Sequence, residues 1–146
     1  MNFDYNGASY NLEIEPLTVS GGHLIYACGE PTFKVLSIIV KDNVSELTLL
    51  REQSLEHLDI YADTKCGIYN LKTTSKVVLK LENKYIDEAI NKNAEIEIDD
   101  LTFNILSEEI SDIDYVSDDK IDKHEIEKYM LVDKNYEGIV LSVTRV

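Results

Sequence analysis

Basic residues and cysteines are scarce in this chain, and each shortage argues against a class of function. The sequence holds 14 lysines and arginines against 28 aspartates and glutamates, a formal net charge of −14 over 146 residues. Phosphate groups favour positively charged surfaces, so we expect no direct binding to nucleic acid or to an anionic membrane. The two cysteines, Cys28 and Cys66, stand far apart, and we expect both to be reduced, buried thiols.

Targeting segments and cofactor motifs are also missing. The first ten residues lack a basic region followed by an apolar run, so we expect no secretory signal and predict a cytoplasmic location. No apolar run approaches the roughly 18 residues of a transmembrane helix. Gly21-Gly22 lacks the lysine and hydroxyl residues of a phosphate-binding loop. His124-Glu125 lacks the second histidine of a zinc-protease helix, because Lys128 occupies that position. The sequence therefore predicts no cofactor.

Calcium binding and cysteine catalysis are two other chemistries that the sequence could suggest. A calcium loop beginning at Asp112 would need glycine at its sixth position, where Ser117 stands, so this motif is absent. No metal site is predicted, although a looser calcium site stays an alternative, made of Asp112, Asp114, Asp118 and Asp119. Neither cysteine has the flanking signature of a catalytic nucleophile, so we predict that the protein is not an enzyme.

What is present predicts one β-rich domain over residues 1–146, because an apolar content of 44% is enough for one core. The densest strand pattern runs from Phe33 to Arg51 and is interrupted once, at Asp42-Asn43. Its first half has no polar alternation, which is typical of a strand covered on both faces. We therefore expect a hairpin at the middle of a sheet.

The clearest local signal is Asn6-Gly7, a dipeptide that favours a two-residue hairpin turn. A turn there pairs Tyr5 with Ala8 and Phe3 with Tyr10. Alternation then predicts that one face of the hairpin is buried, and this face carries Tyr5, Tyr10, Leu12 and Ile14.

Further along, residues 68–73 and 76–81 have the pattern of two separate strands, and 139–146 that of a last one. Apolar spacing predicts helices near residues 84–93 and 119–132, the first with Asn83 as N-cap. The expected fold class is α+β, a predominantly antiparallel, meander-type β-sheet of about eight or nine strands with two short helices.

Acidic charge is concentrated in the last third of the chain. Residues 1–94 have a net charge of −4 and residues 95–146 one of −10; within residues 95–127, 13 acids stand beside only Lys120 and Lys123. A solvated, solubilising surface is the simpler interpretation. Concentrated like charge also destabilises a fold locally, and a basic target would favour it despite that cost. The predicted partner-binding residues are Asp112, Asp114, Asp118, Asp119 and Asp122, with Tyr115 as an aromatic anchor.

These patterns lead to a functional hypothesis. We expect an acidic, non-enzymatic interaction protein that binds and blocks a basic surface on another protein, of which a nucleic-acid-binding surface is one candidate. Immunity proteins and phage-encoded inhibitors of host defence are classes of this kind. The alternative is a small-molecule-binding or enzymatic domain with a pocket between the sheet and the 84–93 helix, using tyrosines and Cys66 or His57.

Overall fold

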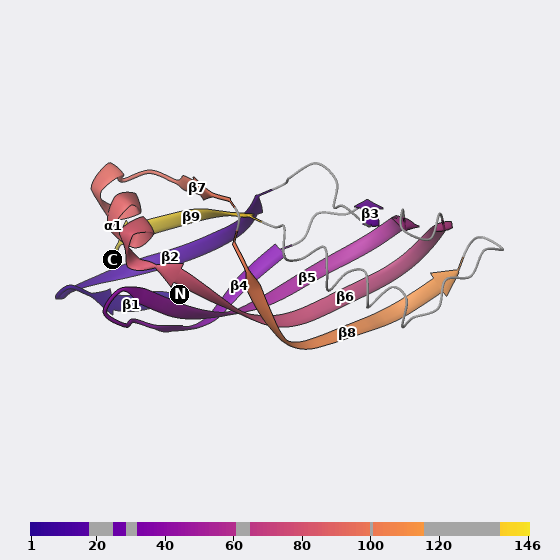
Figure 1. Ribbon diagram of the computed structural model, residues 1–146, viewed down its shortest axis with the longest axis horizontal. Helices are drawn as coiled ribbons and strands as arrows, with labels where there is room; N and C mark the ends of the chain where they lie inside the picture. Colours follow the sequence, from indigo (N-terminus) through magenta and orange to yellow (C-terminus); the bar gives the residue numbers. More distant parts are fainter. Residues whose placement is uncertain (18–24, 29–31, 61–64, 100, 116–137) are drawn as a thin grey trace.

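The computed structural model describes residues 1–17, 25–28, 32–60, 65–99, 101–115 and 138–146 (Figure 1). These residues form nine strands and one helix. In chain order they are β1 (Asn2–Tyr5), β2 (Ala8–Leu17), β3 (Ile25–Cys28), β4 (Thr32–Ile39), β5 (Val44–Ile60), β6 (Lys65–Glu82), α1 (Asn83–Lys92), β7 (Ile96–Ile98), β8 (Phe103–Tyr115) and β9 (Gly138–Arg145). The predicted class, α+β with predominantly antiparallel strands, is confirmed.

The strands form two sheets, not the single one expected. Sheet A has the order β1-β2-β9-β7, and sheet B has the order β3-β5-β6-β8 with β4 also paired to β5. Every strand pair is antiparallel. The meander holds from β4 to β6, but β9 inserts between β2 and β7 in sheet A. The chain therefore passes from sheet A to sheet B between β2 and β3 and returns to sheet A between β6 and β7. It crosses again between β7 and β8 and between β8 and β9.

The N-terminal hairpin has the predicted register, with Tyr5 opposite Ala8 and Phe3 opposite Tyr10. Asn6 and Gly7 both have positive φ, 50° and 82°, as the expected turn requires. Tyr5, Leu12 and Ile14 are buried, and Tyr10 packs half-buried against the core. The prediction for this segment is confirmed.

The core lies where sheet A and α1 pack against one end of sheet B. Figure 1 shows α1 and sheet A together at that end, while β5, β6 and β8 run on past them. Aliphatic side chains from both sheets fill the interface, because alternate positions of each strand point inward. The completely buried ones include Leu12, Leu47, Leu49, Leu79, Leu81, Ile139 and Leu141, with Ile86 and Ala89 from α1.

The hairpin of β4 and β5 exists, but two of its predicted features are wrong. Its strand β4 lies at an edge of sheet B and is not covered on both faces, since Leu36 is 37% and Ile39 53% exposed. There are two causes. A register shift between Val35 and Ser37 makes Leu36 an extra residue in β4, and one face of β4 is open to solvent. Residues 68–73 and 76–81 also belong to one strand, β6, not to two.

The helix α1 confirms the prediction for residues 84–93 to within one residue at each end. Asn83 is not its N-cap: Glu82 takes that position, with no side-chain capping hydrogen bond. Asn93 ends the helix in the left-handed conformation, and its N–H donates to the Ile90 carbonyl at 3.2 Å. The predicted helix 119–132 lies outside the described residues. Within the described part of the chain, no helix has the length and apolar character needed to cross a membrane.

Candidate functional site

Three of the six predicted partner-binding residues lie on β8. In its register with β6, Asp114 lies opposite Asn70 and Tyr115 opposite Tyr69. Asp112 lies within the register shift between Ser111 and Asp114. Among the described strands, β8 has β6 as its one hydrogen-bonded neighbour. The other three predicted residues, Asp118, Asp119 and Asp122, lie outside the described part of the chain. Whether the six gather on one surface stays a prediction.

The fold creates an acidic surface that the sequence did not reveal. On the outer face of sheet A, Glu15 and Glu97 lie on either side of Val140, and Glu13 lies opposite Ser142. Asp4 of β1 shares this face, and its carboxylate accepts a hydrogen bond from the Ser9 hydroxyl at 2.7 Å. All four acids are exposed. We call Asp4, Glu13, Glu15 and Glu97 the acidic face; the exposed Glu95 and Asp99 flank it before and after β7.

No basic side chain offsets this charge within the strands of sheet A. Their one lysine or arginine is Arg145, which lies opposite Tyr10 and so belongs to the other face. Glu13 and Glu15 stand two positions apart on one strand, about 7 Å, and Glu15 and Glu97 two strands apart, about 10 Å. Charges this close are only partly screened at physiological salt, so their fields add.

Two sets of hydrogen bonds hold α1 against the neighbouring strands. The buried Tyr5 hydroxyl donates to the Asp87 carboxylate at 2.6 Å, which ties α1 to the N-terminal hairpin. Burial, followed by this bond, raises the pKa of Tyr5 to about 12. At the start of α1, the Asn83 amide donates to the Lys41 carbonyl at 2.7 Å and accepts from the Ser45 hydroxyl at 2.6 Å.

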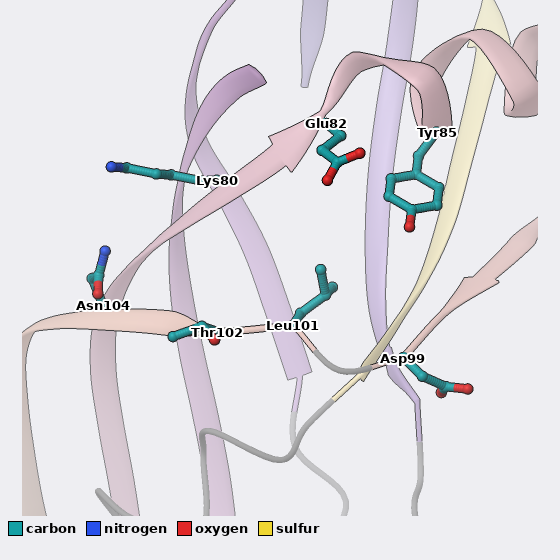
Figure 2. A pocket seen from close by; sticks show the side chains of 7 residues that line it. All are labelled: Lys80, Glu82, Tyr85, Asp99, Leu101, Thr102 and Asn104. Atoms are coloured by element: carbon teal, nitrogen blue, oxygen red, sulfur yellow. The ribbon is translucent and has the colours of Figure 1, made fainter. Parts of the chain in front are cut away.

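A cleft of about 590 Å³ lies where the end of β6, the start of α1 and the β7–β8 connection meet (Figure 2). Its position matches the pocket expected for the small-molecule alternative. Lys80, Glu82 and Asp99 contribute charges, and among the described lining residues Leu101 is the one aliphatic side chain. Ligand pockets are mostly apolar with a few polar groups, so this lining is unlike that of a typical small-molecule site.

Two lining residues of the cleft, Glu82 and Tyr85, already hold a cation of the chain itself, although that lysine is not among the lining residues. The Lys84 ammonium contacts the Glu82 carboxylate at 3.0 Å and lies 5.0 Å from the centroid of the Tyr85 ring. The hydrogen bond to Glu82 is the main cause of the raised pKa of Lys84. Figure 2 shows Leu101 pointing toward Glu82 and Tyr85, and Lys80 pointing away from them. The cleft thus combines a carboxylate, an aromatic ring and an aliphatic contact.

No family model matches this chain, and comparisons with curated proteins and with solved structures found no match either. Within the described residues, no group of three or more histidine, cysteine, aspartate or glutamate side chains is arranged to hold a metal ion. The functional argument therefore rests on the acidic face and the cleft.

Proposed function

We propose that this protein is an acidic, non-enzymatic interaction protein that binds and blocks a basic surface of another protein. The observation that carries the proposal is the acidic face: four exposed carboxylates on paired strands, with no base among them. Carboxylates held on a sheet lose little conformational entropy on binding, unlike those of a flexible acidic tail.

The charge of the whole chain supports the same function. A net charge of −14 gives a long-range field that attracts cationic partners and repels anionic ones. Complementary fields of this kind raise association rates and reject wrong partners more than they add affinity. A nucleic-acid-binding cleft is a basic surface that a cell commonly exposes, which suggests an immunity protein or a phage-encoded defence inhibitor acting in the cytoplasm. The predicted residues of β8 and beyond, Asp112 to Asp122, would extend the contact.

The cleft beside α1 is the specific support for the alternative, a small-molecule-binding or enzymatic domain. Its charged and open lining favours contact with a charged group of a partner over enclosure of an apolar ligand. The interaction function therefore explains both the acidic face and the cleft, whereas the small-molecule alternative explains only the cleft.

The test begins with capture of the partner from the source organism on immobilised protein at low salt, followed by association kinetics with the purified partner. The variant Glu13→Lys with Glu15→Lys reverses the centre of the acidic face. It should slow association by about tenfold or more at low salt and flatten the salt dependence, because steering contributes factors of about 10 to 1,000.

The matched control is Asp42→Lys with Glu52→Lys. It changes the net charge by the same amount as the face variant, but at the β4–β5 turn and on β5 of sheet B. A third variant, Asp118→Lys with Asp119→Lys, tests the residues predicted from the sequence. If the face variant associates at the wild-type rate, or no slower than the control, the acidic face only keeps the protein soluble and the proposal is wrong.

A further inference from the structure

Lys84 shows what kind of group is attracted by Glu82 and Tyr85, two of the residues that line the cleft. Its ammonium lies between the Glu82 carboxylate and the Tyr85 ring, at 3.0 Å from an oxygen and 5.0 Å from the ring centroid. The two attractions are of different kinds, one to a carboxylate and one to an aromatic face, and both select a cation. The Lys84 side chain is nevertheless 66% exposed, so it is held at the surface and not enclosed.

From this arrangement we propose that the cleft receives an arginine side chain of the basic partner, which displaces Lys84 from Glu82 and Tyr85. The inference rests on the proposed function, since it names the group by which the partner is anchored. It adds a specific pocket to a surface that otherwise offers only charge.

Arginine fits this site better than lysine does. Its planar guanidinium can stack on the Tyr85 ring while donating two parallel hydrogen bonds to the Glu82 carboxylate, and an ammonium does neither. Its aliphatic stem can pack on Leu101, which points toward the other two side chains in Figure 2. Arginine is also weakly hydrated compared with lysine, so it loses less on leaving water.

The surroundings agree with a cationic guest that arrives from the acidic face. Asp99 lines the cleft and also flanks the acidic face at the end of β7, so one carboxylate borders both. Lys80, the cation that would oppose the guest, points away from Glu82 and Tyr85 (Figure 2). Displacing Lys84 costs little, because ion pairs between exposed side chains contribute little to stability.

The test needs no natural partner. Isotope-labelled protein is titrated with N-acetyl-arginine amide, a capped arginine with one positive charge, while backbone amide resonances are followed. Shifts should concentrate at Tyr85, Leu101 and Thr102 and saturate. N-acetyl-lysine amide should bind more weakly, and the neutral N-acetyl-leucine amide should not produce these shifts.

Two lysine variants separate a site from general charge. Lys84→Gln removes the lysine that competes with the ligand and should tighten capped-arginine binding about two- to fivefold. This factor corresponds to the strength of one exposed cation–π contact, which the ligand would no longer have to displace. Lys92→Gln removes the same charge from the same helix, where Lys92 pairs with Glu88 at 2.6 Å away from the cleft lining. It should leave the affinity at the wild-type value.

Glu82→Gln, an exposed and isosteric change, should weaken the binding of capped arginine. Equal effects of the two lysine variants, or shifts centred on Glu13, Glu15 and Glu97, would overturn the cleft proposal and leave the proposed function standing. Saturable cleft binding together with partner association that is indifferent to the acidic face would instead overturn the proposed function.

Discussion

Replacing Asn83 by alanine should be one of the most damaging single changes at this end of the molecule. The Asn83 side chain is buried, at 9% exposure, and it joins the first residue of α1 to the turn between β4 and β5. Its amide donates to the carbonyls of Lys41 at 2.7 Å and Asp42 at 3.3 Å. Its carbonyl oxygen accepts from the Ser45 hydroxyl at 2.6 Å.

The expected loss follows from these contacts. Each hydrogen bond contributes about 0.5–1.5 kcal/mol net, and a buried hydroxyl left without its acceptor costs about 1–3 kcal/mol more. Ser45 is completely buried, so Asn83→Ala leaves its hydroxyl without this acceptor and without access to water. Counting the two short bonds and that penalty, the free energy of unfolding should fall by about 3 kcal/mol.

Urea unfolding of four proteins measures this loss: the wild type, Asn83→Ala, Ser45→Ala and the double variant. With Ser45→Ala in place the stranded hydroxyl is gone, so Asn83→Ala should then cost only about 1–2 kcal/mol. The control is Asn2→Ala, which removes one exposed hydrogen bond and should stay within about 0.5 kcal/mol of the wild type. A loss below about 0.5 kcal/mol for Asn83→Ala, or strict additivity in the double variant, would refute this reasoning.

Two further predictions concern the N-terminal hairpin. Tyr5→Phe removes the bond to Asp87 and should lower the free energy of unfolding by about 1 kcal/mol at neutral pH, as read from urea midpoints. Because the folded-state pKa of Tyr5 is raised to about 12, the contribution is complete below the ordinary value near 10 and is lost as the pH rises through 12. The gap between the two proteins should therefore narrow over that range, and a constant gap would contradict the assignment. Gly7→Val should cost about 1–2 kcal/mol, since φ is +82° and no atom lies within 4 Å of an added Cβ, so the cost is purely conformational. Gly7→Asn, which tolerates this conformation, should lose much less, and equal losses would show that the turn geometry is not the cause.

Local chemistry explains which parts of the fold could be predicted. Asn6-Gly7 determines a turn, and the turn then determines every pair in the hairpin, so the register could be read residue by residue. The spacing of Ile86 and Ala89 likewise identified α1. Both are decided by neighbours close in sequence.

Long-range pairing explains what could not be predicted. The alternation of Leu12 and Ile14 with Glu13 and Glu15 showed which side of β2 faces outward, but not that β9 would bring Glu97 beside them. No pattern within β2 or β7 encodes the strand that separates them. The acidic face was therefore invisible in the sequence, although each of its carboxylates was in view.

Buried polar residues explain why the sequence predicted two strands where the structure has one, β6. Thr73 and Ser75 are almost completely buried, and they lie on the inward face of sheet B with Arg51 and Gln53. A polar run at inward positions has the pattern of a break between strands. Here hydrogen bonds offset the cost of burying polar groups. Arg51 donates to the Gln53 side chain at 3.0 Å, and the Thr73 hydroxyl donates to the Gln53 backbone carbonyl at 3.5 Å.

The insertion of β9 between β2 and β7 has a consequence for the order of events in the cell. Leu12 pairs with Val143, so sheet A closes only after the chain has been synthesised through β9. Contacts of such high sequence separation slow folding, and synthesis itself proceeds at about 5–20 residues per second. A chain synthesised only as far as β7 carries all four carboxylates of the acidic face, but Glu97 does not yet lie beside Glu15. The complete acidic face, and with it full-rate association of the proposed partner, should therefore appear only once β9 has paired with β2 and β7.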